Sequence, residues 1–197
     1  SDAGEASGNS SLTFTSANWD TPQTVTVTGA DDSIIDGTIT STATIAVDDA
    51  NSDNDFDDVT DQTVSVDTTD DDVAGFTIVE LDGSTAVDEA GSTDTFTVVL
   101  DAQPTSDVVL TVTSDDTSEA TVNSPLTFTP INWDTPQTVT VTGADDSIID
   151  GTTTSTITIA VDDANSDNDF DAVADKTVSV DTTDDDVAGF TIVELDG

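Results

Sequence analysis

The sequence repeats itself with an offset of 114 residues. Residues 1–83 align with residues 115–197, and only 13 of these 83 aligned pairs differ. The segment Asn-Trp-Asp-Thr-Pro-Gln-Thr-Val-Thr-Val-Thr-Gly, for example, occurs at 18–29 and again at 132–143. A period of this length fits a whole domain better than one unit of a solenoid. The repeat therefore predicts successive copies of one domain.

The phase of the repeat divides the chain into three parts. Residues 74–187 form one complete repeat, and residues 1–73 match only its later part. Residues 188–197 restart the pattern found at 74–83. We interpret the chain as a window on a longer tandem array, cut out of register with its domain borders. The alternative is strand exchange, in which the segment 188–197 of one chain completes the open edge of another.

Short segments of alternating apolar and hydroxyl side chains dominate each repeat. In such a segment Val or Ile faces a core and Thr faces water, which is the two-residue period of a β-strand. No segment shows a sustained helical period, so we expect no substantial helix. The pattern predicts an all-β, antiparallel sandwich of about seven to nine strands per repeat. The strands predicted in the complete repeat are 76–80, 95–100, 108–113, 126–129, 138–142, 155–161 and 177–180.

The charge of the chain limits its partners and its chemistry. The chain has 43 acidic residues and one basic residue, a formal net charge of −42. Such a charge repels nucleic acid and anionic membrane surfaces. No apolar run is long enough for insertion into a membrane. Because the chain contains almost no counter-charge of its own, a divalent metal, concentrated salt or a cationic partner has to supply one.

The residue types also exclude most catalytic machinery. The sequence contains no Cys and no His, which excludes thiol nucleophiles, serine–histidine triads and zinc–thiolate sites. A glycosidase with a carboxylate pair is the enzymatic alternative that remains, but no pocket signature or second functional group accompanies the acids. We therefore expect a protein that is not an enzyme.

The acidic residues avoid the predicted strands and gather in loops. Carboxylates that cluster without basic side chains beside them are typical ligands of a hard divalent metal ion. Ca²⁺ in particular accepts 6–8 oxygen ligands in flexible geometry. The alternative is a solvated acidic coat of the halophilic kind, which would also decorate the exposed positions of strands. Two clusters in each copy of the repeat follow this pattern and are candidate calcium ligands: Asp31, Asp32, Asp36, Asp70, Asp71 and Asp72 in the first copy, and Asp145, Asp146, Asp150, Asp184, Asp185 and Asp186 in the second.

A further acidic loop has a finer spacing. Its oxygen-bearing residues stand at relative positions 1, 3, 5, 7 and 9, as in an EF-hand-type calcium loop. Position 12 is Ala174, where that loop requires a bidentate Glu, so a merely solvated loop is an equal alternative. The candidate ligands of this loop are Asp163, Asn165, Asp167, Asp169 and Asp171.

The order of these motifs resembles the Calx-beta family. The phrases that carry the resemblance are Thr-Ala-Val-Asp-Glu-Ala-Gly-Ser from Thr85, Phe-Thr-Val-Val-Leu from Phe96, and Asn-Trp-Asp-Thr-Pro-Gln-Thr-Val-Thr-Val from Asn132, followed by the closing Asp-Asp-Asp. The resemblance covers 74–187 fully and 1–73 in part. It implies tandem immunoglobulin-like sandwiches with calcium at one end of each. Carried over by position, it adds Glu89 and either Asp115 or Asp116 to the ligands at Asp145, Asp146, Asp150 and Asp184–Asp186.

The resemblance also implies a function. Calx-beta repeats occur in sodium–calcium exchangers and, as long arrays, in bacterial surface proteins. We expect a structural calcium-binding module of a long extracellular adhesin or surface filament, located at the cell surface, in which Ca²⁺ stiffens the domains and their junctions. Its expected partners are neighbouring repeats or subunits of the same protein. The alternatives are a calcium-responsive regulatory module, or one that binds a surface glycan or protein.

Overall fold

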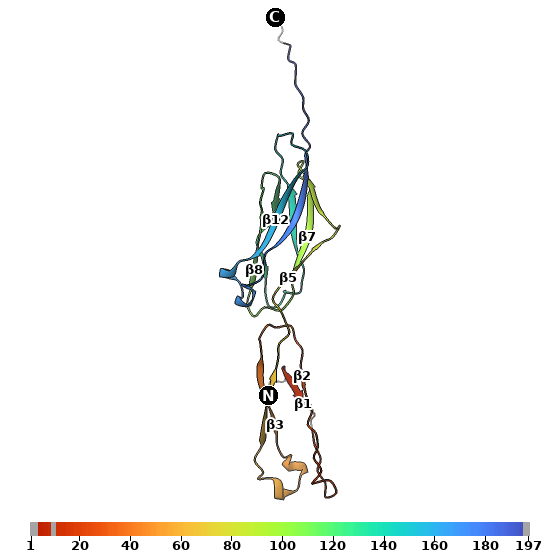
Figure 1. Ribbon diagram of the computed structural model, residues 1–197, viewed down its shortest axis with the longest axis vertical. Helices are drawn as coiled ribbons and strands as arrows, with labels where there is room; N and C mark the ends of the chain where they lie inside the picture. The colour runs from red at the N-terminus through yellow and green to blue at the C-terminus, as the bar shows by residue number, and fades with distance from the viewer. Residues whose placement is uncertain (1–3, 9–10, 195–197) are drawn as a thin grey trace. The chain divides into compact units, whose positions relative to one another are not determined.

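The computed structural model describes residues 4–8 and 11–194. The chain divides into two compact units, unit 1 (Ser1–Asp72) and unit 2 (Val73–Gly197), which are drawn in Figure 1. The helices of the described residues are 3-10 turns of three residues each. Within that part of the chain, no helix has the length and the hydropathy that crossing a membrane requires.

Unit 2 is a sandwich of two β-sheets (Figure 1). One sheet has the strand order β5-β7-β11-β9 and the other the order β10-β8-β12-β13-β6. Neighbouring strands are antiparallel, except for the parallel pair of β13 and β6. The strands are β5 (Phe76–Glu80), β6 (Thr85–Asp88), β7 (Thr93–Leu100), β8 (Val108–Ser114), β9 (Ala120–Val122), β10 (Leu126–Phe128), β11 (Gln137–Gly143), β12 (Thr153–Val161) and β13 (Lys176–Thr183).

The two-residue alternation of the strands places their apolar side chains between the two sheets. Phe96 of β7 is directly opposite Val139 of β11, and both side chains are fully buried. Thr95 and Thr97, which flank Phe96, are only partly buried because they point to the other face of the sheet. Burial of an aliphatic or Phe side chain of this size contributes about 1.5–3 kcal/mol. Each strand therefore contributes its Val, Ile, Leu or Phe positions to one shared core.

The predicted all-β sandwich is confirmed, and all seven predicted strands of the complete repeat are present. Two further strands, β6 and β9, were not predicted. They have only four and three residues, and each contains only Ala and Val as apolar side chains, a weaker signal than the Leu and Phe of the equally short β10. Strand β6 departs from the antiparallel pairing of the other strands, because it pairs with β13 in parallel from Thr85 to Asp88. This pair closes one edge of the five-stranded sheet.

Unit 1 contains two separate strand pairs. Strand β1 (Ala6–Gly8) pairs with β2 (Val27–Gly29), and β3 (Ile39–Ile45) pairs with β4 (Gln62–Thr68), both antiparallel. The loop between β3 and β4 carries two 3-10 turns, η1 (Asp49–Asn51) and η2 (Asn54–Phe56).

The register of unit 1 repeats that of unit 2. Ala6 pairs with Gly29, as Ala120 pairs with Gly143. The described residues of unit 1, which are 4–8 and 11–72, contain no counterpart of β5 to β8, which lie between 76 and 114 in unit 2. The large apolar side chains Phe14 and Phe56 of unit 1 are consequently more than half exposed.

Candidate metal centre

Glu89 directly follows β6 and lies buried at one end of the sandwich. Its backbone N–H donates to the carbonyl oxygen of Thr183 at the end of β13, at 3.0 Å, and its side chain is only 1% exposed. Gly143 allows the end of β11 to lie against β6, because a Cβ atom there would be 1.9 Å from the carbonyl oxygen of Asp88. The close approach of three strand ends therefore holds a carboxylate inside the sandwich.

The carboxylate of Glu89 is buried without a hydrogen bond. Among the described residues, neither of its two oxygens has a hydrogen-bond partner. A buried carboxylate without a cation or hydrogen-bond donors is strongly unfavourable in its charged form. The chain's acidic composition makes the position more unfavourable still, since the side chains around Glu89 are further acids. Such an arrangement requires either a proton or an external cation.

Glu119 approaches Glu89 from the segment before β9. Its carbonyl oxygen accepts hydrogen bonds from the backbone N–H of Ala144 at 2.8 Å and from the hydroxyl of Thr182 at 3.4 Å. These contacts fix Glu119 between the ends of β11 and β13. The side chain is 4% exposed, and its Oε2 atom has no hydrogen-bond partner. Glu119 thus contributes a second buried carboxylate to the same end of the sandwich.

Three aspartates complete the site, which we call the Glu89 cluster: Glu89, Glu119, Asp146, Asp150 and Asp186. The cluster consists of two groups that share Glu89. In one group, Glu89, Glu119 and Asp150 each offer an oxygen, and the three atoms lie within 4.8 Å of one another. The other group consists of Glu89, Asp146 and Asp186, and one carboxylate oxygen from each also lies within 4.8 Å of the others. The Oδ2 atom of Asp186 is buried without a hydrogen-bond partner among the described residues.

The electrostatics of the Glu89 cluster favour uptake of a positive charge. Burial raises the pKa of Glu89, and the neighbouring charges of Asp184, Asp146, Asp150 and Glu119 raise it further. The pKa of Glu119 is raised by burial and then by Asp150. Burial likewise raises the pKa of Asp186, followed by the charge of Asp184. A divalent cation bound by these oxygens would remove the same repulsion that raises the pKa values.

The donor set fits a hard divalent cation. All five side chains of the Glu89 cluster offer carboxylate oxygens, which are the ligands of Ca²⁺, Mg²⁺ and Mn²⁺ rather than of copper or structural zinc. Four oxygens of the cluster are buried without a hydrogen-bond partner. The residues present therefore fit a cation, and irregular loops supply the flexible geometry that Ca²⁺ accepts.

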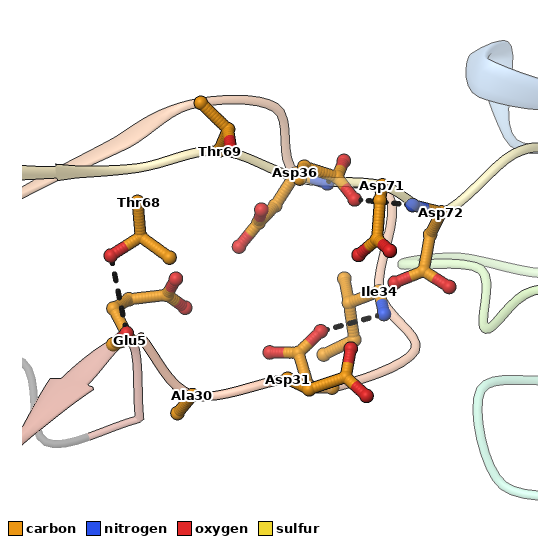
Figure 2. Close-up of a pocket in the computed structure, with 11 residues that line it drawn as sticks. Glu5, Ala30, Asp31, Ile34, Asp36, Thr68, Thr69, Asp71 and Asp72 are labelled. Carbon is orange, nitrogen blue, oxygen red and sulfur yellow. Dashed lines mark hydrogen bonds between the residues drawn. The ribbon is translucent and has the colours of Figure 1, made fainter. Parts of the chain in front are cut away.

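Unit 1 contains a second group at the equivalent place, which we call the Glu5 cluster: Glu5, Asp32 and Asp36. One carboxylate oxygen from each of these residues lies within 4.8 Å of the others. Figure 2 shows the carboxylates of Glu5 and Asp36 turned toward one hollow, which Asp31, Asp71 and Asp72 also line.

The backbone contacts of Glu5 match those of Glu119. Its carbonyl oxygen accepts from the N–H of Ala30 and from the hydroxyl of Thr68. The Glu5 cluster holds the counterparts of Glu119, Asp146 and Asp150, and Asp72, the counterpart of Asp186, lines the same hollow.

Several solved structures are similar to this chain, at low similarity. The apo-form Calx CBD1 domain is 16% identical with a TM-score of 0.41, and the match covers 58% of this chain and 100% of that domain. The chaperone DraB of E. coli is 8% identical with a TM-score of 0.41, and this chain spans 59% of its length. Domains 4 and 5 of the S-layer protein SbsC are 24% identical with a TM-score of 0.37, over 62% of this chain and 63% of theirs. No family model and no curated protein matches the sequence.

The structure brings four of the predicted ligands in unit 2 together and leaves others outside. Glu89, Asp146, Asp150 and Asp186 form the cluster, whereas Asp145 and Asp185 are exposed and belong to neither of its groups. Among the predicted ligands in unit 1, Asp32 and Asp36 come together, and Asp31, Asp71 and Asp72 line the same hollow. Asp184 and Asp70 instead accept hydrogen bonds from backbone N–H groups.

Asp116 accepts hydrogen bonds from a neighbouring residue, Ser118, and belongs to neither group of the Glu89 cluster. Its Oδ1 atom accepts from the backbone N–H of Ser118 at 3.0 Å and from the Ser118 hydroxyl, and these hydrogen bonds lower the pKa of Asp116. The sequence analysis missed Glu119 and Glu5, which lie three residues after Asp116 and Asp2. The signal was available, because this Glu is retained at the same position in both copies of the repeat.

The loop 163–171 lies apart from the Glu89 cluster and folds into two 3-10 turns, η3 (Asp163–Asn165) and η4 (Asn168–Phe170). Asp167 is 5% exposed, and its Oδ2 atom accepts from the N–H of Thr105 at 2.7 Å, from the Thr105 hydroxyl and from the N–H of Ser106. None of the three groups of clustered carboxylates in the described residues contains Asp163, Asn165, Asp169 or Asp171. Asp167 thus stabilises the loop through backbone donors.

Proposed function

We propose that this chain is a structural, calcium-binding segment of an extracellular surface protein, an adhesin or filament. The observation that carries the proposal is Glu89, a fully buried carboxylate with no partner for either oxygen and four further carboxylates beside it. A chain with one basic residue cannot compensate such a site internally. Binding of Ca²⁺ by the Glu89 cluster would supply the missing positive charge and link the strand ends that carry the acids.

The residues of this chain explain how cation binding would stabilise it. Glu89 follows β6, Glu119 precedes β9, Asp146 and Asp150 lie between β11 and β12, and Asp186 follows β13. Ligation by these five would connect four separate segments at one end of the sandwich. Residues 187–194 follow Asp186 directly and repeat the sequence of 73–80, so the same ligands would order the start of the next repeat. The proposed partners are therefore neighbouring repeats or subunits of the same protein.

The expected size of the effect is substantial. Extracellular calcium modules bind with Kd of about 10⁻⁴–10⁻³ M. At a free calcium concentration of about 100 times Kd, one site adds roughly 2.7 kcal/mol to the free energy of unfolding. Because a whole domain is stable by about 5–15 kcal/mol, one or two such sites would control whether the metal-free chain stays folded at elevated temperature.

Thermal melts in calcium and in chelator test the proposal. We expect calcium to raise the melting temperature of unit 2 by several degrees relative to EDTA. Glu89→Gln removes the buried charge, so it should raise the melting temperature in EDTA and abolish most of the increase caused by calcium. Glu194→Gln makes the same chemical change at an exposed position and serves as the control. Identical melts in calcium and EDTA for the wild-type chain would contradict the proposal.

The pairing of β5 with β7 gives strand exchange between chains less support than the proposal of a structural calcium-binding segment. The segment 190–194 repeats the sequence of β5, and β5 pairs with β7 from Phe76 opposite Leu100 to Glu80 opposite Phe96. Unit 1 shows no counterpart of β7 in the part that the structure describes. An exchanged strand would therefore have to displace β5 from unit 2 of another chain, against the high effective concentration of the strand already there.

A further inference from the structure

Asp184 occupies a central position beside the Glu89 cluster without belonging to either of its groups. It directly follows β13, and its Oδ2 atom accepts a hydrogen bond from the backbone N–H of Gly151 at 2.9 Å. Its Oδ1 atom accepts from the backbone N–H of Asp186 at 2.7 Å. One carboxylate therefore joins the loop between β11 and β12 to the chain that leaves β13.

Unit 1 repeats this arrangement. The Oδ2 atom of Asp70 accepts from the N–H of Asp36 at 3.0 Å and from that of Gly37 at 2.9 Å, and its Oδ1 atom accepts from the N–H of Asp72 at 2.8 Å. The described part of unit 1 lacks the counterparts of β5 to β8, so the surroundings of the two copies differ. The hydrogen bonds form in both copies and are therefore a property of the two acidic segments themselves.

The groups held by Asp184 are adjacent to cluster residues. Gly151 follows Asp150, and its φ of 81° is a left-handed conformation that a residue with a side chain rarely adopts. Asp186 is itself a member of the cluster. Fixing these two backbone N–H groups consequently fixes the positions from which the carboxylates of Asp150 and Asp186 extend toward Glu89.

We propose that Asp184, and Asp70 in the other copy, is a positioning residue of the candidate metal centre and not one of its ligands. The backbone donors occupy lone pairs on both oxygens of its carboxylate, so it acts on the cation through Asp150 and Asp186. This inference rests on the proposed binding of a divalent cation by the Glu89 cluster. It assigns different roles to neighbouring residues of the same Asp-Asp-Asp run.

Calcium titration calorimetry on the full chain tests the inference, with two variants of equal charge. Asp184→Asn keeps one acceptor oxygen and loses the other, and it should weaken calcium binding in unit 2 by about 10- to 100-fold, the usual effect of removing an outer-shell partner. Asp185→Asn removes the same charge from an exposed neighbour, and it should change the affinity by less than about threefold. Titrations at 20 °C, with the fold of each variant checked by circular dichroism, separate the affinity from thermal stability, since a purely stabilising residue would leave the affinity unchanged.

Amide hydrogen exchange in EDTA supplies the second measurement and needs no metal. Asp184→Asn should accelerate exchange of the Gly151 and Asp186 amides at least several-fold, because the acceptor of each is lost or weakened. Asp150→Asn, which alters a proposed ligand, should weaken calcium binding without accelerating exchange of the Gly151 amide. Asp185→Asn should change neither amide.

Three results would overturn the inference, and they are distinguishable. Equal calcium affinities of Asp184→Asn and Asp185→Asn would show that only net charge matters. A weaker affinity of Asp184→Asn with unchanged amide exchange would make Asp184 a direct ligand. A wild-type chain that binds no calcium would overturn the proposed function and with it the positioning role, whereas the first two results leave calcium binding by the Glu89 cluster intact.

Discussion

Asp167 accepts a hydrogen bond from the backbone N–H of Thr105 at 2.7 Å, and this contact joins residues that are 62 positions apart in the sequence. The Thr105 hydroxyl and the N–H of Ser106 donate to the same oxygen. A single carboxylate thus accepts hydrogen bonds from the backbone N–H groups of the turn between β7 and β8. The same contact holds the long loop between β12 and β13 against that turn. In unit 1 the segment 48–57 has the same sequence as 162–171 but no such turn to contact among the described residues.

Replacement of Asp167 should destabilise unit 2 selectively. Asp167→Ala leaves the N–H groups of Thr105 and Ser106 without their acceptor, at a cost of about 1–3 kcal/mol for such a group. Urea unfolding followed by Trp133 fluorescence in a Trp19→Phe background measures the change. Asp53→Ala is the matched control, because Asp53 is the exposed counterpart of Asp167, and it should change the stability by less than about 0.5 kcal/mol. Equal effects of the two substitutions would contradict the role assigned to Asp167.

Gly143 should not tolerate a side chain, whereas Gly29 should. A Cβ atom at Gly143 would lie 1.9 Å from the carbonyl oxygen of Asp88, which is backbone and cannot rotate away. Gly143→Ala should therefore displace β6 from β11 and cost about 1–3 kcal/mol or more. At Gly29, the equivalent position, the nearest atom is Thr68 Cγ2 at an ordinary 3.5 Å, and Gly29→Ala should be close to neutral.

The stability curves of the two Gly variants can be recorded under the same urea conditions. If the urea concentration at the midpoint of unfolding is the same for Gly143→Ala as for the wild-type chain, the close approach of β11 to β6 does not exist in solution. Gly143→Ala should also weaken calcium binding, because the displaced segment carries Glu89.

Two Phe residues with identical flanking segments should differ in their contribution to stability. Phe170 is fully buried, and Phe56, its counterpart in unit 1, is 58% exposed. Phe170→Ala should cost about 3–5 kcal/mol through lost burial and the resulting cavity. Phe56→Ala should have little effect on either unit. Differential scanning calorimetry of both variants measures their thermal stability. A loss of stability in Phe56→Ala as large as that in Phe170→Ala would show that unit 1 buries this side chain in solution.

The metal-free chain should become more stable as the pH falls from 7 toward 5. Burial, and then neighbouring acids, raise the pKa of Glu89 and Glu119, so the native state retains protons that the unfolded state releases. Stability is then greatest below the unfolded pKa of about 4.3 and decreases as the pH rises through the native pKa. Melting temperatures in EDTA between pH 5 and 7 measure the trend.

Stability should instead decrease with falling pH in two situations, below about pH 4 and in the presence of calcium. Hydrogen bonds to Asp167 and Asp184 lower the pKa of these residues, so their contribution is present above the ordinary Asp pKa of about 3.9 and is lost as the pH falls below it. Saturating calcium should abolish the gain between pH 7 and 5, since protons then compete with the cation. A melting temperature in EDTA that decreases steadily from pH 7 to 5 would contradict the raised pKa values.

In the complete repeat the two-residue alternation predicted seven strands, because it shows which face of a strand is apolar, but the same Leu-Thr-Phe-Thr segment at 12–15 of unit 1 is not a strand. The seven segments of the complete repeat are all strands, whereas the short β6 and β9 contain only Ala and Val as apolar side chains. The gathering of Asp in loops was likewise evident from the sequence. It located Asp146, Asp150 and Asp186 but could not separate them from the adjacent Asp145, Asp184 and Asp185, whose side chains have other surroundings.

The sequence by itself determined the repeat, the alternating pattern that favours strands, and the shortage of positive charge. Only the tertiary structure decided what each acid does. Glu89 and Glu119 are 30 residues apart and meet because β6, β11 and β13 end at the same place. The Asp-Asn-Asp-Phe segment occurs in both units, yet Phe170 and Asp167 are buried while Phe56 and Asp53 are exposed. The reason is physical: burial and hydrogen bonding depend on the strands packed against a segment, and those strands come from elsewhere in the chain.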